Sequence, residues 1–290
     1  MTSLARDRLS THDTSRKIRN FLMCAGLVIM AALAILPLLS VFIYVINQGA
    51  SALSVDFFTQ LPKPVGETGG GVANALVGTV LLVGMASLVG IPWGIAGGVY
   101  LAEYGNGKLA RTLRFATDLM TSIPSIIIGL FAYALVVLPM KHFSAHAGAF
   151  ALAVIMVPVV ARTTEELLRL VPQHIREAGL ALGIPRWKVT LKIVLRGSLG
   201  GITTGVMLAV ARVAGETAPL LFTSFSNRFW ARGLDQPIAS LPVQIYTYAI
   251  SPYEDWHRQA WAGSLVLVLF VFVLNLGTRI FLGHRPAGRE

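Results

Sequence analysis

Two opposite charges lie close together in a long apolar stretch of the chain. Arg212 and Glu216 are four residues apart between Ser198 and Phe225, and this spacing places two side chains on one face of a helix. If the stretch crosses a membrane, each charge costs about 3 kcal/mol on insertion scales, and such residues usually face a water-filled path. The planar donors of arginine suit phosphate or carboxylate oxygens. The pair therefore indicates an anion path, or else a structural pair that neutralises itself.

Other polar residues are weaker candidates for the same path. Thr217 follows the pair directly, and Ser122 and Ser125 flank Pro124. Their hydroxyls could donate to an anion, but serines near a proline also bond back to the helix backbone. Arg162 is either a second charge that attracts the anion at an inner mouth or a basic residue that only marks the inner side of a membrane.

Motifs of common enzymes are absent from the sequence. There is no GxxxxGK[ST] phosphate loop, so we do not expect this chain to hydrolyse ATP. There is no HExxH metal motif and no GxSxG nucleophile motif. His142 and His146 are four residues apart, but they lack a third ligand nearby. We therefore expect no catalytic residues, no metal site and no cofactor bound by this chain.

The composition indicates which elements hold these residues. The 290 residues are 54% hydrophobic and 13% charged, with a mean hydropathy of +0.67, whereas soluble domains carry about 25% charged residues. We expect an all-α integral membrane protein, because backbone groups in hydrocarbon must bond within helices. Six runs approach the roughly 20 residues of a membrane span. They are Phe21–Ile46, Val72–Leu101 with a break at Gly90-Ile91-Pro92, Leu119–Met140, Ala147–Ala161, Ser198–Phe225 and Ala260–Leu282.

The basic residues give these six spans an orientation. The chain has 24 basic and 14 acidic residues, a net charge of +10. The basic residues gather in the N-terminal tail, in the second and fourth loops and in the C-terminal tail, which predicts that both termini are cytoplasmic. The charge is therefore expected to mark the inner side and not a nucleic-acid partner. The expected parts are a cytoplasmic tail (1–20), a six-span domain (21–282) and a second tail (283–290).

The fourth loop, residues 162–192, is more than a connector. Pro172 and the Gly183-Ile184-Pro185 turn bracket a predicted short helix over Gln173–Leu182. Glu177 lies early in this helix, where the helix dipole favours an acid. On spacing alone, the segment is either an amphipathic helix on the membrane surface or a helix that binds a partner.

The residues of this loop favour a partner. Glu177-Ala178-Gly179, Gly183 and Ile193-Val194-Leu195 resemble the EAA signature of bacterial ABC importer permeases. Two positions differ, since Gly179 replaces the second alanine and Arg196 replaces the final proline. The resemblance implies a type I, MetI-like permease architecture. It also implies that Glu177, Ala178, Gly179 and Gly183 dock on a separate ATPase subunit.

Three further stretches are similar to the phosphate permeases of that family. They are Ala211–Pro219, Ser122–Phe131 and Pro237–Val243, with support from Arg162-Thr163-Thr164-Glu165-Glu166. The resemblance implies an importer of inorganic phosphate in the bacterial inner membrane. It also implies a heterodimer with a PstC-like permease, a PstB-like ATPase dimer that uses ATP and Mg, and a periplasmic or lipid-anchored phosphate-binding protein. No nucleic-acid partner is expected.

Two alternatives stay open. One is an ABC permease for another oxyanion or small solute, which would have the same fold. The other is an ion-coupled secondary transporter, although such folds are often built from internal repeats and we find none in this sequence.

Overall fold

The long apolar runs form long helices. The computed structural model describes the backbone of residues 3–283 and the side chains of residues 16–277. Five helical segments are long and apolar enough to cross a membrane, and a bent helix pair supplies a sixth candidate. Each of the six predicted runs overlaps one of these segments. The long helices are α1 (Ser3–Gly49), α3 (Ala73–Glu103), α7 (Ala145–Arg169), α10 (Leu195–Ala214) and α13 (Glu254–Gly283).

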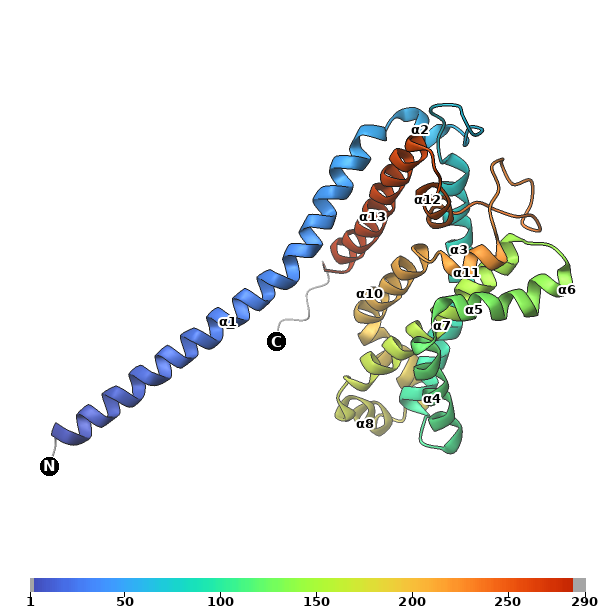
Figure 1. Cartoon of the computed structure of the whole chain (residues 1–290). Helices are drawn as coiled ribbons and strands as arrows, with labels where there is room; N and C mark the ends of the chain where they lie inside the picture. Colours follow the sequence, from blue (N-terminus) through green and yellow to red (C-terminus); the bar gives the residue numbers. More distant parts are fainter. Residues whose placement is uncertain (1–2, 284–290) are drawn as a thin grey trace.

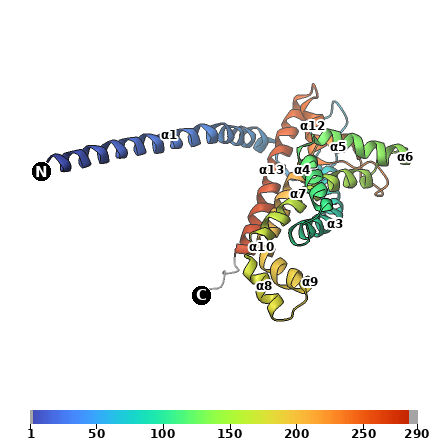
Figure 2. The same ribbon diagram turned by 90° about the horizontal axis from the view of Figure 1, so that it is seen from below.

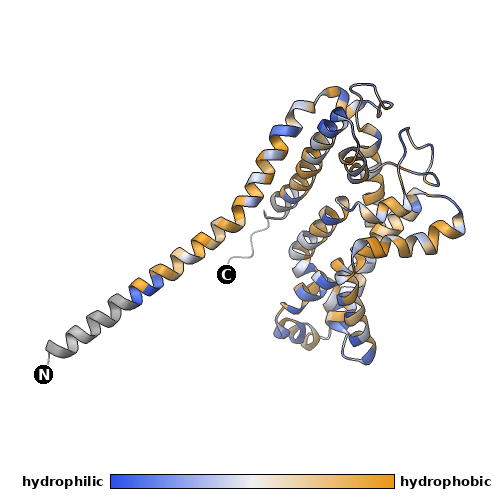
Figure 3. Ribbon diagram, in the orientation of Figure 1, coloured by the Kyte–Doolittle hydropathy of each residue, from blue (hydrophilic) through white to orange (hydrophobic). Residues whose placement is uncertain are grey.

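Three long helices form the centre of the fold. α3, α7 and α10 pack against one another, and their buried aliphatic side chains make up most of the hydrophobic core. α1 extends away from this bundle and meets α13 near its own C-terminal end (Figures 1 and 2). Hydrophobic residues cover the long helices on most sides (Figure 3), as expected for helices in a membrane. The predicted tail at 283–290 lies outside the described residues except for Gly283.

α3 is not broken where the sequence suggested. The break expected at Gly90-Ile91-Pro92 is wrong, because one helix continues from Ala73 to Glu103. Small residues let α3 lie directly on α7 here: a Cβ atom at Gly94 would lie 2.6 Å from the Cβ of Val160. This close packing supports a continuous helix through the proline.

The third predicted span is bent and not a single clean helix. α4 (Lys108–Ser122) ends inside the run predicted at Leu119–Met140. α5 (Ser125–Ala132) begins three residues later, within the same run. The bend between them is 106°. Pro124 explains it, because a proline disfavours the helical conformation of the residue before it, and Ile123 is extended with ψ 132°. After α5 the chain continues through the π-helical η2 (Tyr133–Val137) and α6 (Leu138–Met140).

The fifth predicted span is also interrupted. α10 ends at Ala214, and the short α11 (Ala218–Thr223) begins after Gly215, Glu216 and Thr217. The interruption lies at Gly215 and just before Pro219, two residue types that weaken a helix.

The remaining elements lie at the two ends of the bundle. α4 and α8 lie at one end, and α2 and α12 at the other (Figure 1). The short elements are η1 (Ala50–Ala52), α2 (Val55–Thr59), α8 (Gln173–Ala181), α9 (Arg186–Lys188), the π-helical η3 (Val189–Val194) and α12 (Leu241–Ala249).

Candidate functional site

Arg212 and Glu216 do not share a helical face. The helix that was expected to carry both ends at Ala214, between them. Gly215 caps it by donating its backbone N–H to the Arg212 carbonyl oxygen at 3.1 Å. Within the described part of the chain, no ion pair or hydrogen bond joins the two side chains. The interpretation as a self-neutralising pair therefore has no support in this conformation.

Arg212 faces away from its own chain. Its side chain is exposed, although it lies between the buried residues Ala211 and Val213 near the middle of the predicted fifth run. Among the described residues, none forms an ion pair or a hydrogen bond with its guanidinium. An exposed cation in an apolar span needs water or a polar partner from elsewhere. This arrangement fits a path that is only half formed by this chain.

The two interrupted spans meet at this level. Gly129 in α5 lies against Pro219 in α11, because a Cβ atom at Gly129 would be 2.7 Å from the Cα of Pro219. Ser125 opens α5 and Thr217 precedes α11, and both side chains are half-buried. Ser122 donates its hydroxyl to the Asp118 carbonyl oxygen at 3.0 Å. The Ser122 hydroxyl thus bonds to the helix backbone. This was the alternative to donating to an anion.

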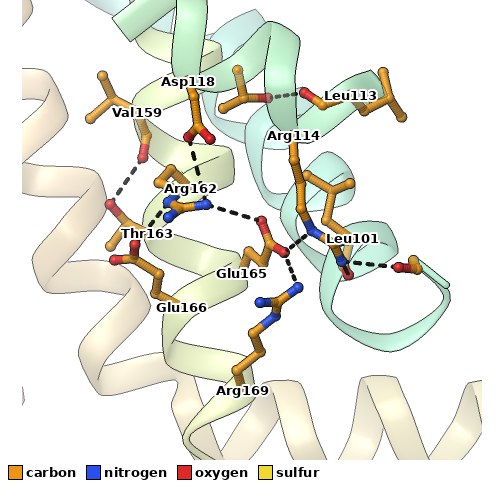
Figure 4. A network of polar contacts seen from close by, with 12 residues as sticks. Leu101, Leu113, Arg114, Asp118, Val159, Arg162, Thr163, Glu165, Glu166 and Arg169 are labelled. Atoms are coloured by element: carbon orange, nitrogen blue, oxygen red, sulfur yellow. Dashed lines mark hydrogen bonds and ion pairs between the residues drawn. The ribbon is translucent and has the colours of Figure 1, made fainter. Parts of the chain in front are cut away.

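Arg162 lies in a network of charges (Figure 4). Its Nε is 2.8 Å from Oε1 of Glu166, and its Nη1 is 3.6 Å from Oδ1 of Asp118. The same Nη1 is 4.0 Å from Oε2 of Glu165. Three carboxylates surround this guanidinium and neutralise its charge. Arg162 is therefore better suited to linking α4 to α7 than to attracting an anion.

The centre of this network is the buried carboxylate of Glu165. Its side chain is 1% exposed, and Oε1 lies 2.6 Å from Arg114 and 2.6 Å from Arg169. Arg114 also donates to the carbonyl oxygens of Leu101 and Gly105 at 2.6 and 3.0 Å. One arginine therefore joins α4 to α7 and to the end of α3. Sequence reasoning counted Arg114 only as a basic loop residue.

α8 has the form that the sequence predicted for the partner-binding segment. It covers Gln173–Ala181, and Gly183 ends it with a φ of +74°. Glu177 and Ala178 are exposed. These exposed residues can dock on another protein.

The unusual glycine of this segment has a structural reason. Gly179 is buried, and a Cβ atom there would lie 2.9 Å from Cγ2 of Val189. Its carbonyl oxygen accepts the Ile184 N–H at 3.2 Å. The lack of a side chain therefore lets α8 lie directly on η3.

Sequence reasoning also missed an ion pair beside α8. Arg176 and Glu103 are 73 residues apart and meet at 2.6 Å, with side chains that are 15% and 5% exposed. An acid at the end of an apolar run indicates that a cation should lie nearby to pair with it. The sequence gives no information on which of the many arginines supplies it.

The described residues contain no group of three or more His, Cys, Asp or Glu side chains that could hold a metal ion. Of the two histidines with helical spacing, His146 lies 3.2 Å from Oδ1 of Asp235 through its Nδ1. The ring nitrogen of His142 contacts the Phe143 carbonyl oxygen. The two histidines thus have separate partners.

Comparisons with known proteins give a consistent result. The model of the family described as "Binding-protein-dependent transport system inner membrane component" matches residues 94–284. The chain is 48% identical over 271 residues to the phosphate transport system permease protein PstA of Haemophilus influenzae, which covers 93% of this chain and 96% of the relative. It is 36% identical over 266 residues to the phosphate transport system permease protein PstA 1 of Mycobacterium tuberculosis, with 90% and 88% covered.

A solved structure has the same fold. It is an inward-facing conformation of the MetNI methionine ABC transporter, with a TM-score of 0.56 and 20% identity. The match covers 73% of this chain and 93% of the transporter chain.

Proposed function

The chain belongs to the binding-protein-dependent transport system inner membrane components and, within them, to the PstA permeases, and from this premise we propose how it works. It is a multi-pass membrane protein and the permease subunit of an ABC importer for inorganic phosphate. The finer features, which are its partners, its orientation and its path residues, are our proposals.

We infer that this chain forms half of the path and that a PstC-like permease forms the other half. The exposed guanidinium of Arg212 supports this, because a charge in an apolar span must meet polar groups or water. Across such an interface the arginine lowers the barrier for the anion near mid-membrane. Glu216, Thr217 and Ser125 lie at the helix breaks on either side of the α5–α11 contact and complete this chain's part of the path.

A PstB-like ATPase dimer binds at the end of the bundle that holds α8. The exposed Glu177 and Ala178 support this placement, because an exposed acid can meet a cation or an amide of the partner. ATP and Mg are used by that partner. Closure of the ATPase on ATP moves α8, and the spans then change between outward and inward openings.

Both termini lie in the cytoplasm and the opposite end of the bundle faces the phosphate-binding protein. The basic residues of α4, α8 and η3 gather at one end of the bundle and support this orientation. α12 and the loop before it lie at the other end. Four arginines of the inner end are held in ion pairs, namely Arg114, Arg162, Arg169 and Arg176. Other basic side chains there, such as Arg111 and Lys192, are exposed.

The single observation that carries the proposal is the unpartnered Arg212 in an apolar span. The test is phosphate uptake by proteoliposomes that hold this chain with its companion permease and ATPase, supplied with the binding protein and ATP. We expect uptake only when all four components are present. Uptake without the ATPase would instead indicate a secondary transporter, and preferred uptake of sulfate would indicate a permease for another oxyanion.

A further inference from the structure

A half-buried arginine connects α8 to a second membrane span. Arg176 donates from Nε and Nη2 to Oε1 of Glu103 at 2.9 and 2.6 Å. Glu103 is the last residue of α3, whereas α8 follows α7 in the chain. The pair is therefore a tertiary link between segments that the chain connects only through other elements.

The same guanidinium holds the end of α7. Nη1 donates to the Val171 carbonyl oxygen at 2.6 Å, and Nη2 donates to the Leu168 carbonyl oxygen at 2.8 Å. Leu168 lies in the last turn of α7 and Val171 lies just beyond its end. The Leu168 carbonyl oxygen also accepts the Val171 N–H at 3.2 Å. Arg176 thus joins three segments, and the fixed fork of arginine suits this better than any other side chain.

A second arginine, which follows α8 in the chain, also binds Glu103. Arg186 donates from Nη2 to the main-chain carbonyl oxygen of Glu103, and its guanidinium lies 5.0 Å from the ring centre of Tyr104. A polar cavity of about 660 Å³ lies between the end of α3, α8 and η3, and both arginines line it. The cavity separates α8 from α3, so the two helices have little apolar packing between them. Polar side chains are therefore their main link.

α3 extends this link across the whole bundle. The helix has 31 residues, so it is about 46 Å long at 1.5 Å per residue. Near its first turn, Asn74 donates to the Asn227 carbonyl oxygen at 2.5 Å. One turn further, the Thr79 hydroxyl accepts the Leu241 N–H at 2.8 Å, at the start of α12.

We propose that Arg176 and Glu103 are positioning residues that transmit the movement of α8 to α3, and through α3 to the loop and helix α12 at the opposite end. The proposal rests on the proposed function, because it assigns to α8 the contact with the ATPase. It adds a route that does not use the covalent connections of α8 to α7 and η3. In this route a rigid helix carries the movement directly from one end of the bundle to the other.

The test separates coupling from folding. Loss of Arg176 alone leaves a buried carboxylate without a cation, which destabilises a fold strongly. The variant is therefore Arg176→Met with Glu103→Gln, which removes both charges and keeps the side-chain volumes, a change that proteins often tolerate. The control is Arg111→Ala, since Arg111 is an exposed arginine of α4 at the same end of the bundle.

The measurement is the number of ATP molecules hydrolysed per phosphate imported by the complete importer in proteoliposomes. For the double variant we expect this ratio to rise about tenfold, the usual size of a coupling effect, while the ATPase still co-purifies. The Arg111→Ala importer keeps the ratio of the unmodified importer. An unchanged ratio in the double variant, including equal losses of ATP hydrolysis and uptake, would overturn the proposal. Failure of the unmodified importer to import phosphate would overturn the proposed function instead.

Discussion

Gly129 in α5 and Pro219 in α11 are in direct contact, at the place where the two interrupted spans cross. A Cβ atom at Gly129 would lie only 2.7 Å from the Cα of Pro219 and 3.5 Å from the Ala218 carbonyl oxygen. The contact is with backbone atoms, which cannot move aside as a flexible side chain can. The breaks that flank these two helices are therefore held in a fixed relation to each other.

Gly129→Ala should disturb this crossing. We expect the free energy of unfolding to fall by about 1–3 kcal/mol, as for other overpacked sites, with slower phosphate uptake. Thermal unfolding of the purified importer measures the first effect. The matched control is Gly84→Ala in α3, because a Cβ atom at Gly84 would meet no atom within 4 Å. Equal melting temperatures for the two variants would contradict the predicted contact.

Gly179→Ala should displace α8 from η3. The new methyl group would lie 2.9 Å from Cγ2 of Val189, a stiff β-branched side chain with little freedom to move. We expect weaker binding of the ATPase and slower uptake. The double variant Gly179→Ala with Val189→Ala gives the methyl group room, so it should recover most of the loss. Recovery is measured as co-purified ATPase per permease; no recovery would show that another contact requires the glycine.

Arg114→Ala should weaken the fold by removing a cation from the buried carboxylate of Glu165. We expect a loss of about 1–3 kcal/mol in the free energy of unfolding, the usual effect of removing a hydrogen bond to a charged group. Glu166→Gln provides the control, because that exposed pair with Arg162 is worth at most about 1 kcal/mol. Chemical unfolding in detergent measures both. If Arg114→Ala and Glu166→Gln lower the free energy of unfolding equally, the buried Glu165 pair is not the main stabilising contact of the network.

Glu177→Ala should separate coupling from stability. The side chain is exposed, and it forms no ion pair or side-chain hydrogen bond with the described residues, so the melting temperature of the isolated permease should stay unchanged. We expect co-purification of the ATPase and phosphate uptake to fall by about tenfold. The control is Lys192→Ala, which removes another exposed charge of the same region. Normal ATPase binding by the Glu177 variant would remove it from the docking surface.

The sequence was sufficient to predict the spans and α8, because their signals are local. A run of apolar residues forms a helix wherever the backbone must bond to itself, and Gly183 with Pro185 ends α8 by its own conformational preferences. The resemblance to the phosphate permeases also rested on continuous stretches of the chain. These features do not depend on which helices become neighbours.

The geometry around the prolines was predicted less well. Pro92 and Pro124 both lie in apolar runs, but only at Pro124 is the helix interrupted, with a bend of 106°. The difference is in the packing, since glycines bring α3 against α7 around Pro92. α10 also ends at Ala214, between Arg212 and Glu216. A spacing of four residues indicates one helical face only if the helix continues across it.

The ion pairs at the α8 end could not be predicted. Arg176 and Glu103 are 73 residues apart, and Arg114 is 51 residues from Glu165. The loops contain many arginines, and sequence spacing does not distinguish those in buried pairs from those in solvent. Only the positions of α3, α4 and α7 in the fold decide which cation reaches which acid.

The central claim is that Arg212 lowers the barrier for the anion in the membrane. One comparison tests this claim most directly. Initial rates of radiolabelled phosphate uptake are measured in proteoliposomes with the complete importer carrying Arg212→Gln, beside the charge-retaining Arg212→Lys. Because no described residue of this chain pairs with Arg212, assembly should persist in both. We predict a loss of about a hundredfold for the glutamine variant, at the upper end of the roughly 1.5–3 kcal/mol of a hydrogen bond to a charged group, and a smaller loss for lysine. Uptake by the glutamine variant at the unmodified rate would contradict the account.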